Sequence, residues 1–187
     1  MSAPPATHYL SVFQKDRSYH ELRVLLLVES VVRAHPEPGH VDGLTQLAKL
    51  DFFLRYPHLS VRALEDLEPR DPRLHLAVPG TRAVETPMHR HRYGPWDERY
   101  YTVVGALISR RLLHRGEEGR ARITLSPTVN GAALALRATS LAPWTQIADR
   151  CSAIAEAAGH LSGNRLAGLI RDSLPEVGLH DFGQEIT

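Results

Sequence analysis

Apolar residues early in the chain recur at every third or fourth position, which is the spacing of an amphipathic α-helix. The run Leu22–Val32 is apolar on most sides, so the helix that it predicts should lie at the centre of the fold. Ser18 and Glu21 stand at the spacing of an N-terminal capping box, and Pro36 ends the helix shortly after it. We therefore predict a central first helix that begins at Ser18.

The next stretch predicts two shorter helices and an irregular connector. The first covers residues 44–55, with Asp42 as its cap, and the second covers residues 60–67. Residues 68–88 are rich in proline, which is typical of a connector, although residues 74–78 have the composition of a short strand.

Beyond the connector, the pattern alternates between helices and one hairpin. Pro95 suits the first position of a helix, and the apolar residues that follow it repeat at helical spacing as far as Ile108. Residues 112–125 flank a glycine-containing turn and predict a β-hairpin, and Ser126–Pro127 predicts the start of a further helix. A helix followed by a two-stranded hairpin is the second half of a winged helix.

The C-terminal part predicts two more helices, over residues 142–158 and from Ser162 to Leu174, which form a helical hairpin. The fold class is therefore mainly α, with a winged-helix core, one β-hairpin wing and a C-terminal helical hairpin. We expect three parts: a flexible N-terminal arm (1–16), the winged-helix domain (17–140) and the helical hairpin with its tail (141–187).

The composition is that of a globular protein, with 43% apolar and 23% charged residues. The longest aliphatic run, Val24–Val28, is far short of the roughly 20 residues that cross a bilayer. Residues 1–16 contain Pro4 and Pro5 and lack the layout of a secretory signal, so we expect a cytoplasmic protein without membrane contact. The single cysteine, Cys151, excludes an internal disulfide, and its place on an apolar helix face predicts a buried, inert thiol.

The sequence gives no catalytic constellation, so we expect neither an enzyme nor a cofactor. Phosphate-binding glycine loops, zinc-protease motifs and nucleophile elbows are missing from the chain. His89 and His91 alternate, but no convincing third and fourth metal ligands lie near them, so we predict no metal site. Asp51, Asp97 and Glu98 are expected to cap helices and pair with cations rather than to act as general acids.

Positive charge gathers in residues 82–122, where nine arginines stand against five acidic residues although the whole chain carries only +1. Within this region, arginines and aromatic residues surround the Gly94–Pro95 turn, and a helix start flanked by arginine can hold a phosphate or a carboxylate. Trp96 and Tyr100 are expected to pack into the core. The candidate residues for binding a partner or nucleic acid are Arg90, Arg92, Tyr93, Arg99, Arg120 and Arg122. For Arg90 and Arg92, the alternative is that they only hold the turn together.

Three stretches occur in the order Gly43–Pro57, Arg92–Tyr100 and Leu161–Ile170, the last running on to Leu174–Val177. Together they resemble the middle component of bacterial ABC-three-component systems, the group that includes Lamassu-type anti-phage defence. The resemblance covers most of residues 43–177. It implies a non-catalytic adaptor that holds an SMC-like ABC ATPase and an effector, often a nuclease, in one complex. ATP hydrolysis and any killing activity would belong to those partners.

A winged helix can also belong to a DNA-binding transcriptional regulator or an antitoxin. In that alternative the helix over residues 60–67 reads the DNA and the hairpin over residues 112–125 is the wing. Two features count against it. The 60–67 segment is short and carries Glu65 and Asp66, with Glu68 next to it, beside only Arg62, and the hairpin tip carries Glu117 and Glu118. DNA contact within a larger complex, through Arg120 and Arg122, stays open.

Overall fold

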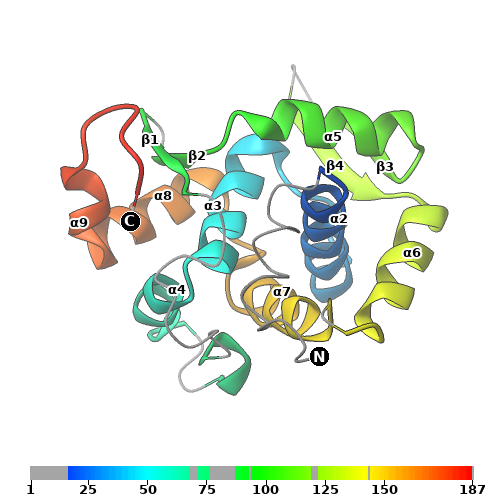
Figure 1. Ribbon diagram of the computed structural model, residues 1–187, viewed down its shortest axis with the longest axis horizontal. Helices are drawn as coiled ribbons and strands as arrows, with labels where there is room; N and C mark the ends of the chain where they lie inside the picture. The colour runs from blue at the N-terminus through cyan, green and yellow to red at the C-terminus, as the bar shows by residue number, and fades with distance from the viewer. Residues whose placement is uncertain are drawn as a thin grey trace, which may run out of the picture.

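The computed structural model describes residues 17–67, 71–75, 87–92, 94–118, 122–142 and 144–186. Over these residues the chain is mainly helical, as predicted, with two small antiparallel hairpins (Figure 1). The helices are α2 (Arg17–Ala34), α3 (Gly43–Arg55), α4 (Pro57–Leu64), the 3-10 helix η1 (Pro72–His75), α5 (Arg99–Ser109), α6 (Val129–Thr139), α7 (Trp144–Ala158), α8 (Gly163–Ser173) and α9 (Pro175–Leu179). The hairpins pair β1 (His89–His91) with β2 (Gly94–Trp96), and β3 (Leu113–Glu118) with β4 (Arg122–Pro127).

The central position predicted for the first helix is confirmed. Helix α2 packs against α5, α6, α7 and β4, which surround it in the view of Figure 1. Its residues from Val24 to Val28 are at most 1% exposed, because neighbours cover every side of this part of the helix. Burial of this aliphatic run supplies a large part of the hydrophobic stabilisation.

Helix α3 is the second buried helix, and every residue from Gln46 to Arg55 is buried. It packs against α2, α4, α7, α8 and β2, and so joins the two ends of the molecule. The expected domain boundary at residue 140 falls between α6 and α7. Side chains from both sides of that boundary, including Leu25 and Ile154, belong to one hydrophobic cluster.

Three predicted helix starts are wrong, each because a nonlocal contact replaces the local signal. Ser18 lies inside α2 rather than at its cap, and the Glu21 carboxylate pairs with arginines instead. Pro95 lies in strand β2, and α5 begins only at Arg99. Strand β4 continues through Ser126 and Pro127, so the cap of α6 is Thr128, whose hydroxyl oxygen accepts a hydrogen bond from the Gly131 amide at 3.0 Å.

Two other local predictions agree with the structure only in part or not at all. The α3 cap position is Asp42, as predicted, but its side chain makes no capping hydrogen bond, and its backbone amide donates to Gln46 Oε1. The strand predicted over residues 74–78 is wrong at its beginning, because Leu74 and His75 belong to η1. Residues 76–78, like the arm predicted over residues 1–16, lie outside the described residues.

The second hairpin confirms the predicted strand pair and shows one additional contact. Leu113 lies opposite Pro127 and Glu118 opposite Arg122. Val41, in the link between α2 and α3, forms an isolated bridge with Leu125. The Val41 amide donates to the Leu125 carbonyl at 2.8 Å, and the Leu125 amide donates to the Val41 carbonyl at 2.9 Å. One residue of this link therefore pairs with β4 beside the hairpin.

Candidate functional site

The predicted basic and aromatic segment folds into the β1–β2 hairpin rather than into the start of a helix. His89 lies opposite Trp96 and His91 opposite Gly94, whose φ of +107° allows the tight reversal. We call residues 87–92 and 94–99 the hairpin site. Because Pro95 is inside a strand, the site offers no free helix amides at the position where the sequence analysis expected them.

The C-terminal segment holds the hairpin in place. The Arg90 amide donates to the Gln184 carbonyl and the Gly183 amide donates to the Arg90 carbonyl, each at 2.8 Å. Tyr56 joins the two segments at the base, because its hydroxyl donates to the Ile186 carbonyl at 2.8 Å and accepts from the Met88 amide at 2.7 Å. Residues more than 90 positions apart therefore build one small sheet, which periodicity alone does not reveal.

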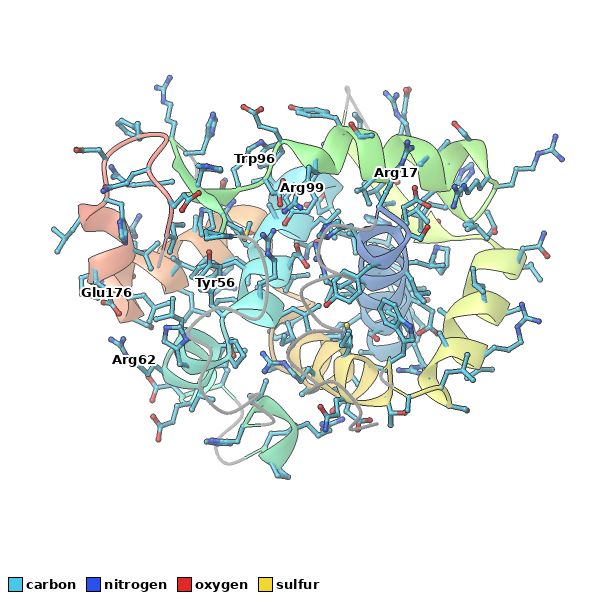
Figure 2. All side chains as sticks on the ribbon, viewed as in Figure 1. Arg17, Tyr56, Arg62, Trp96, Arg99 and Glu176 are labelled. Atoms are coloured by element: carbon cyan, nitrogen blue, oxygen red, sulfur yellow. The ribbon has the colours of Figure 1, made fainter. Side chains whose placement is uncertain are left out.

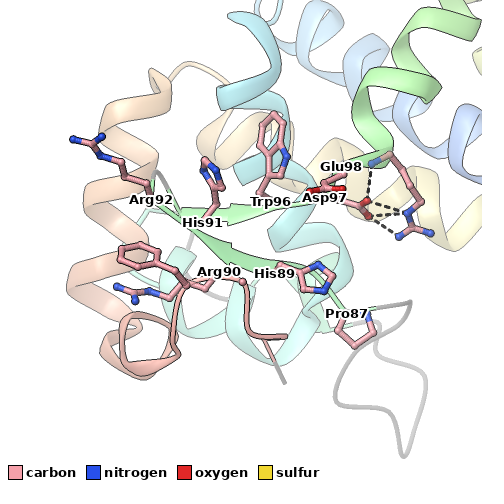
Figure 3. A pocket seen from close by; sticks show the side chains of 11 residues that line it. Pro87, His89, Arg90, His91, Arg92, Trp96, Asp97 and Glu98 are labelled. Carbon is pink, nitrogen blue, oxygen red and sulfur yellow. Dashed lines mark hydrogen bonds and ion pairs between the residues drawn. The ribbon is translucent and has the colours of Figure 1, made fainter.

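Arg90 and Arg92 are the two predicted site residues that the structure brings together. Arg90 lies with its guanidinium 4.5 Å from the centre of the Phe182 ring, and its Nη1 donates to the His180 carbonyl at 2.6 Å. Arg92 is exposed and points away from the hairpin (Figure 3). Arg90 holds the C-terminal segment and also lines the surface, and its use in binding a partner stays a prediction.

The other predicted site residues do not join them. Tyr93 and Arg120 lie outside the described residues, and so does the side chain of Arg122, whose backbone belongs to β4. Arg99, whose side chain is 38% exposed, donates to the Asp97 carboxylate at distances from 2.5 to 3.1 Å. Figure 3 shows this ion pair at Asp97 beside the hairpin. Arg99 therefore holds Asp97 while part of its side chain stays at the surface.

Trp96 also departs from its predicted place. It stands in β2 and is only partly buried, not the anchor of a long helix. Its ring makes an edge contact with Tyr100, with 5.5 Å between the ring centres, and lies 6.1 Å from the His91 ring. Tyr100 itself is fully buried, as predicted.

A buried ion network beneath the hairpin site was missed by the sequence analysis. Asp51 accepts two hydrogen bonds from Arg23, at 2.9 and 3.0 Å, and a third from the Tyr100 hydroxyl at 2.6 Å. Arg55 donates to Asp97 at 2.8 Å and lies 3.8 Å from Asp51, so it joins the two carboxylates. The predicted role of these two aspartates as ion-pair partners is confirmed.

The network also fixes the charge states of its members. Burial would raise the pKa of Asp97, but hydrogen bonds from Arg99 and Arg55 and their charges outweigh it and hold that pKa well below its usual range. Burial first, and then the Asp51 charge, raise the pKa of the Tyr100 hydroxyl well above its usual value. Burial likewise raises the pKa of the Cys151 thiol, which fits the predicted inert cysteine.

Two hollows flank the hairpin site. One has a volume of about 870 Å³ and lies between the hairpin and Phe182, with Trp96, Asp97 and Glu98 in its lining (Figure 3). The other, of about 690 Å³, lies on the side of α3, α8 and α9. We call the second one the cationic hollow. Both volumes fall in the range of small-molecule sites.

A third surface lies at the far end of the molecule, on α6. Val129, Ala133 and Leu136 follow at helical spacing on one side of this helix, and Val129 and Leu136 are 88% and 61% exposed. Leu141, just past the helix end, is also exposed. We call these four residues the apolar face.

Among the described residues, no group of three or more His, Cys, Asp and Glu side chains is arranged to hold a metal ion. In the same part of the chain, no helix combines the length and apolar character needed to span a bilayer. No protein-family model, curated protein or solved structure matches this sequence.

Proposed function

We propose that the protein is a non-catalytic adaptor that bridges two partners in a cytoplasmic complex, an SMC-like ABC ATPase and an effector. The observation that carries this proposal is the presence of two surfaces of different chemistry at opposite ends of the molecule. The hairpin site lies at one end and helix α6, with its apolar face, at the other (Figure 1). A protein that holds two others together needs two separate surfaces, and their different chemistry lets each select its own partner.

The apolar face is suited to a protein partner. Isolated exposed apolar residues are ordinary, but a row of them on one helix side is typical of interaction sites. Arg137 is the one charged residue of α6. It lies one turn after Ala133, at the edge of this side, so a partner that covers the apolar face must leave this charge in solvent or pair it.

The hairpin site is suited to a partner of opposite charge. Arg90 and Arg92 are anchored to a small sheet that the C-terminal segment and Tyr56 hold together. Because the sheet fixes the backbone, less conformational freedom is lost when an acidic partner binds. The buried pairing of Asp51 and Asp97 also supports a structural role for these carboxylates rather than a catalytic one.

The test is co-expression with the SMC-like ATPase and the effector encoded beside this protein, followed by co-purification. Val129→Glu combined with Leu136→Glu should remove one partner and keep the other. Arg90→Ala combined with Arg92→Ala should do the reverse. Asn130→Glu, an exposed change on the same helix outside the apolar face, is the matched control and should keep both partners.

Two results would overturn the adaptor proposal. One is failure of the wild-type protein to co-purify with either partner. The other is reproducible hydrolysis of ATP or nucleic acid by the isolated protein that is lost when one carboxylate is replaced.

A DNA-binding winged helix is the second candidate, and the Val41–Leu125 bridge favours it. The bridge pairs Val41, between α2 and α3, with the hairpin that follows α5, and a pairing at this point of the chain supports a winged-helix arrangement. In that arrangement the helix before the wing, α5, would read DNA, and not the segment over residues 60–67. Arg62 of that segment pairs with Glu176 of α9 (Figure 2).

The exposed side of α5 is free of acidic residues and carries Tyr101, Thr102 and Ser109. A gel-shift titration of the isolated protein at about 150 mM salt, where the screening length is roughly 8 Å, separates the two candidates. Tight, sequence-specific binding that is lost in Tyr101→Ala would favour the regulator. Weak binding that falls steeply with salt and is indifferent to sequence would favour the adaptor.

A further inference from the structure

Lys49 is a buried cation without a carboxylate partner among the described residues. It is 2% exposed, and its ammonium donates one hydrogen bond, to the Thr45 carbonyl at 3.1 Å. Burial lowers its pKa to about 8. Arg23 and Arg55, which are equally buried, are instead paired with carboxylates. An ammonium has three donors, so Lys49 keeps hydrogen-bonding capacity that the described residues around it do not use.

The cationic hollow opens onto this lysine. Its lining combines Lys49 of α3 with Arg90 and Arg92 of the hairpin site and Arg171 of α8. Its other polar lining comes from Thr45, His91 and Asn164, and none of the described residues that line it is acidic. Arg171 pairs with Asp172 beside the hollow at 3.1 Å, so the positive potential comes mainly from Lys49, Arg90 and Arg92.

Part of the lining of the hollow forms an apolar wall. Ile170, Val177 and Leu179 contribute to it from α8 and α9, together with Pro95 of β2. Gly94 lies directly beside the lysine, because a Cβ built there would lie 3.6 Å from Lys49 Cε and 4.0 Å from its Nζ, which are ordinary contact distances. A cationic floor beside an apolar wall fits a ligand that has an anionic head and an apolar body.

We propose that the cationic hollow binds a small organic phosphate monoester, with Lys49 holding the phosphate and the apolar wall holding the organic body. A phosphate monoester matches the hollow better than a carboxylate does, since it carries close to two charges and three acceptor oxygens. The arginines at the rim present planar donors to the same group. The hollow shares Arg90 and Arg92 with the proposed partner surface, but every residue of its lining belongs to this chain, so binding is testable on the isolated protein whether or not the adaptor proposal holds.

Lysine labelling gives a direct assay on the full-length protein. The chain has two lysines, Lys15 and Lys49, so protein labelled with [13C]lysine gives two Cε signals, and Lys49→Met assigns them. Phenyl phosphate should shift the Lys49 signal in a saturable manner. Benzoate, which has the same ring with a carboxylate, should bind about tenfold or more weakly, and so should inorganic phosphate, which lacks the ring.

Variants separate the site from general attraction by positive charge. Lys49→Met should weaken phenyl phosphate binding about 10- to 100-fold by calorimetry, the range for a lost hydrogen bond to a charged group. Arg165→Met removes one charge from α8 outside the hollow and should leave binding unchanged. Arg171→Met, at an exposed position in the lining, should weaken phenyl phosphate binding severalfold. If Lys49→Met does not fold, this second variant tests whether the hollow is the binding site.

Three outcomes would overturn the proposal. A Lys49 signal that does not move at millimolar phenyl phosphate would exclude the site. Equal affinity for benzoate would exclude selection of phosphate. Equal affinity for inorganic phosphate would exclude a role for the apolar wall.

Discussion

The buried ion network allows a sharp test through Asp51→Asn. Asp51 is fully buried and accepts three hydrogen bonds, two from Arg23 and one from Tyr100. Asparagine keeps the size of the side chain but removes its charge and replaces one acceptor oxygen by a donor. Arg23 then loses its carboxylate partner and keeps its contact with the His20 ring, while an amide N–H faces donors that need an acceptor.

The expected loss of unfolding free energy is large because the buried guanidinium of Arg23 loses its carboxylate partner. Breaking a buried ion pair by removing one partner costs about 3–5 kcal/mol of unfolding free energy. For a chain of 187 residues, each kcal/mol lowers the melting temperature by about 2–4 °C. We therefore expect Asp51→Asn to lower the melting temperature by about 6–20 °C.

Urea unfolding followed by circular dichroism measures this loss. Asp149→Asn, the same change at an exposed position of α7, is the control and should alter stability by less than about 0.5 kcal/mol. Tyr100→Phe should cost about 1–2 kcal/mol, since it removes one hydrogen bond to the carboxylate. A change below about 1 kcal/mol for Asp51→Asn would refute the reasoning, because it would mean that Asp51 is not a buried partner of Arg23.

Three further changes test other parts of the structure. Gly131→Ala should destabilise the protein by about 3 kcal/mol or more in urea unfolding, because its Cβ would lie 1.9 Å from the Leu112 carbonyl oxygen. Gly105→Ala, with nothing within 4 Å, should instead stabilise α5 by up to about 1 kcal/mol. Tyr56→Phe should lower the free energy of unfolding by about 1–3 kcal/mol and speed amide exchange in the C-terminal segment. Unchanged exchange there would contradict the inference that the Tyr56 hydroxyl holds this segment. Lys49→Met should stabilise the protein by about 3 kcal/mol at pH 7, since burial lowers that lysine's pKa from 10.5 to about 8. Between pH 8 and 10.5 the unfolded state binds more protons, so wild-type stability gains on the variant, and a pH-independent difference would contradict the lowered pKa.

The helices and the second hairpin could be predicted from the sequence because their signals are local. Helices α2, α3, α7 and α8 carry apolar residues at helical spacing, and the Ser162 hydroxyl caps α8 as predicted, accepting from the Arg165 amide at 3.4 Å. Such patterns depend only on which side of a helix or strand faces the core. They also suffice to predict a mainly α fold.

The details that the tertiary structure decided all depend on contacts between distant residues. Pro95 has the features of a helix start, yet pairing with β1, itself held by residues 183–186, keeps it in a strand. Asp51 and Arg23 are 28 positions apart, so no periodicity announces their pair.

Lys49 left one weak signal in the sequence, as one of two lysines in an arginine-rich chain. Its burial follows only from the tertiary structure, in which α3, α8 and the hairpin site meet around it and no described carboxylate pairs with it. Local patterns determine which segments are helical. The environment of a polar side chain depends on which segments pack together, and that is decided by the free energy of the whole fold.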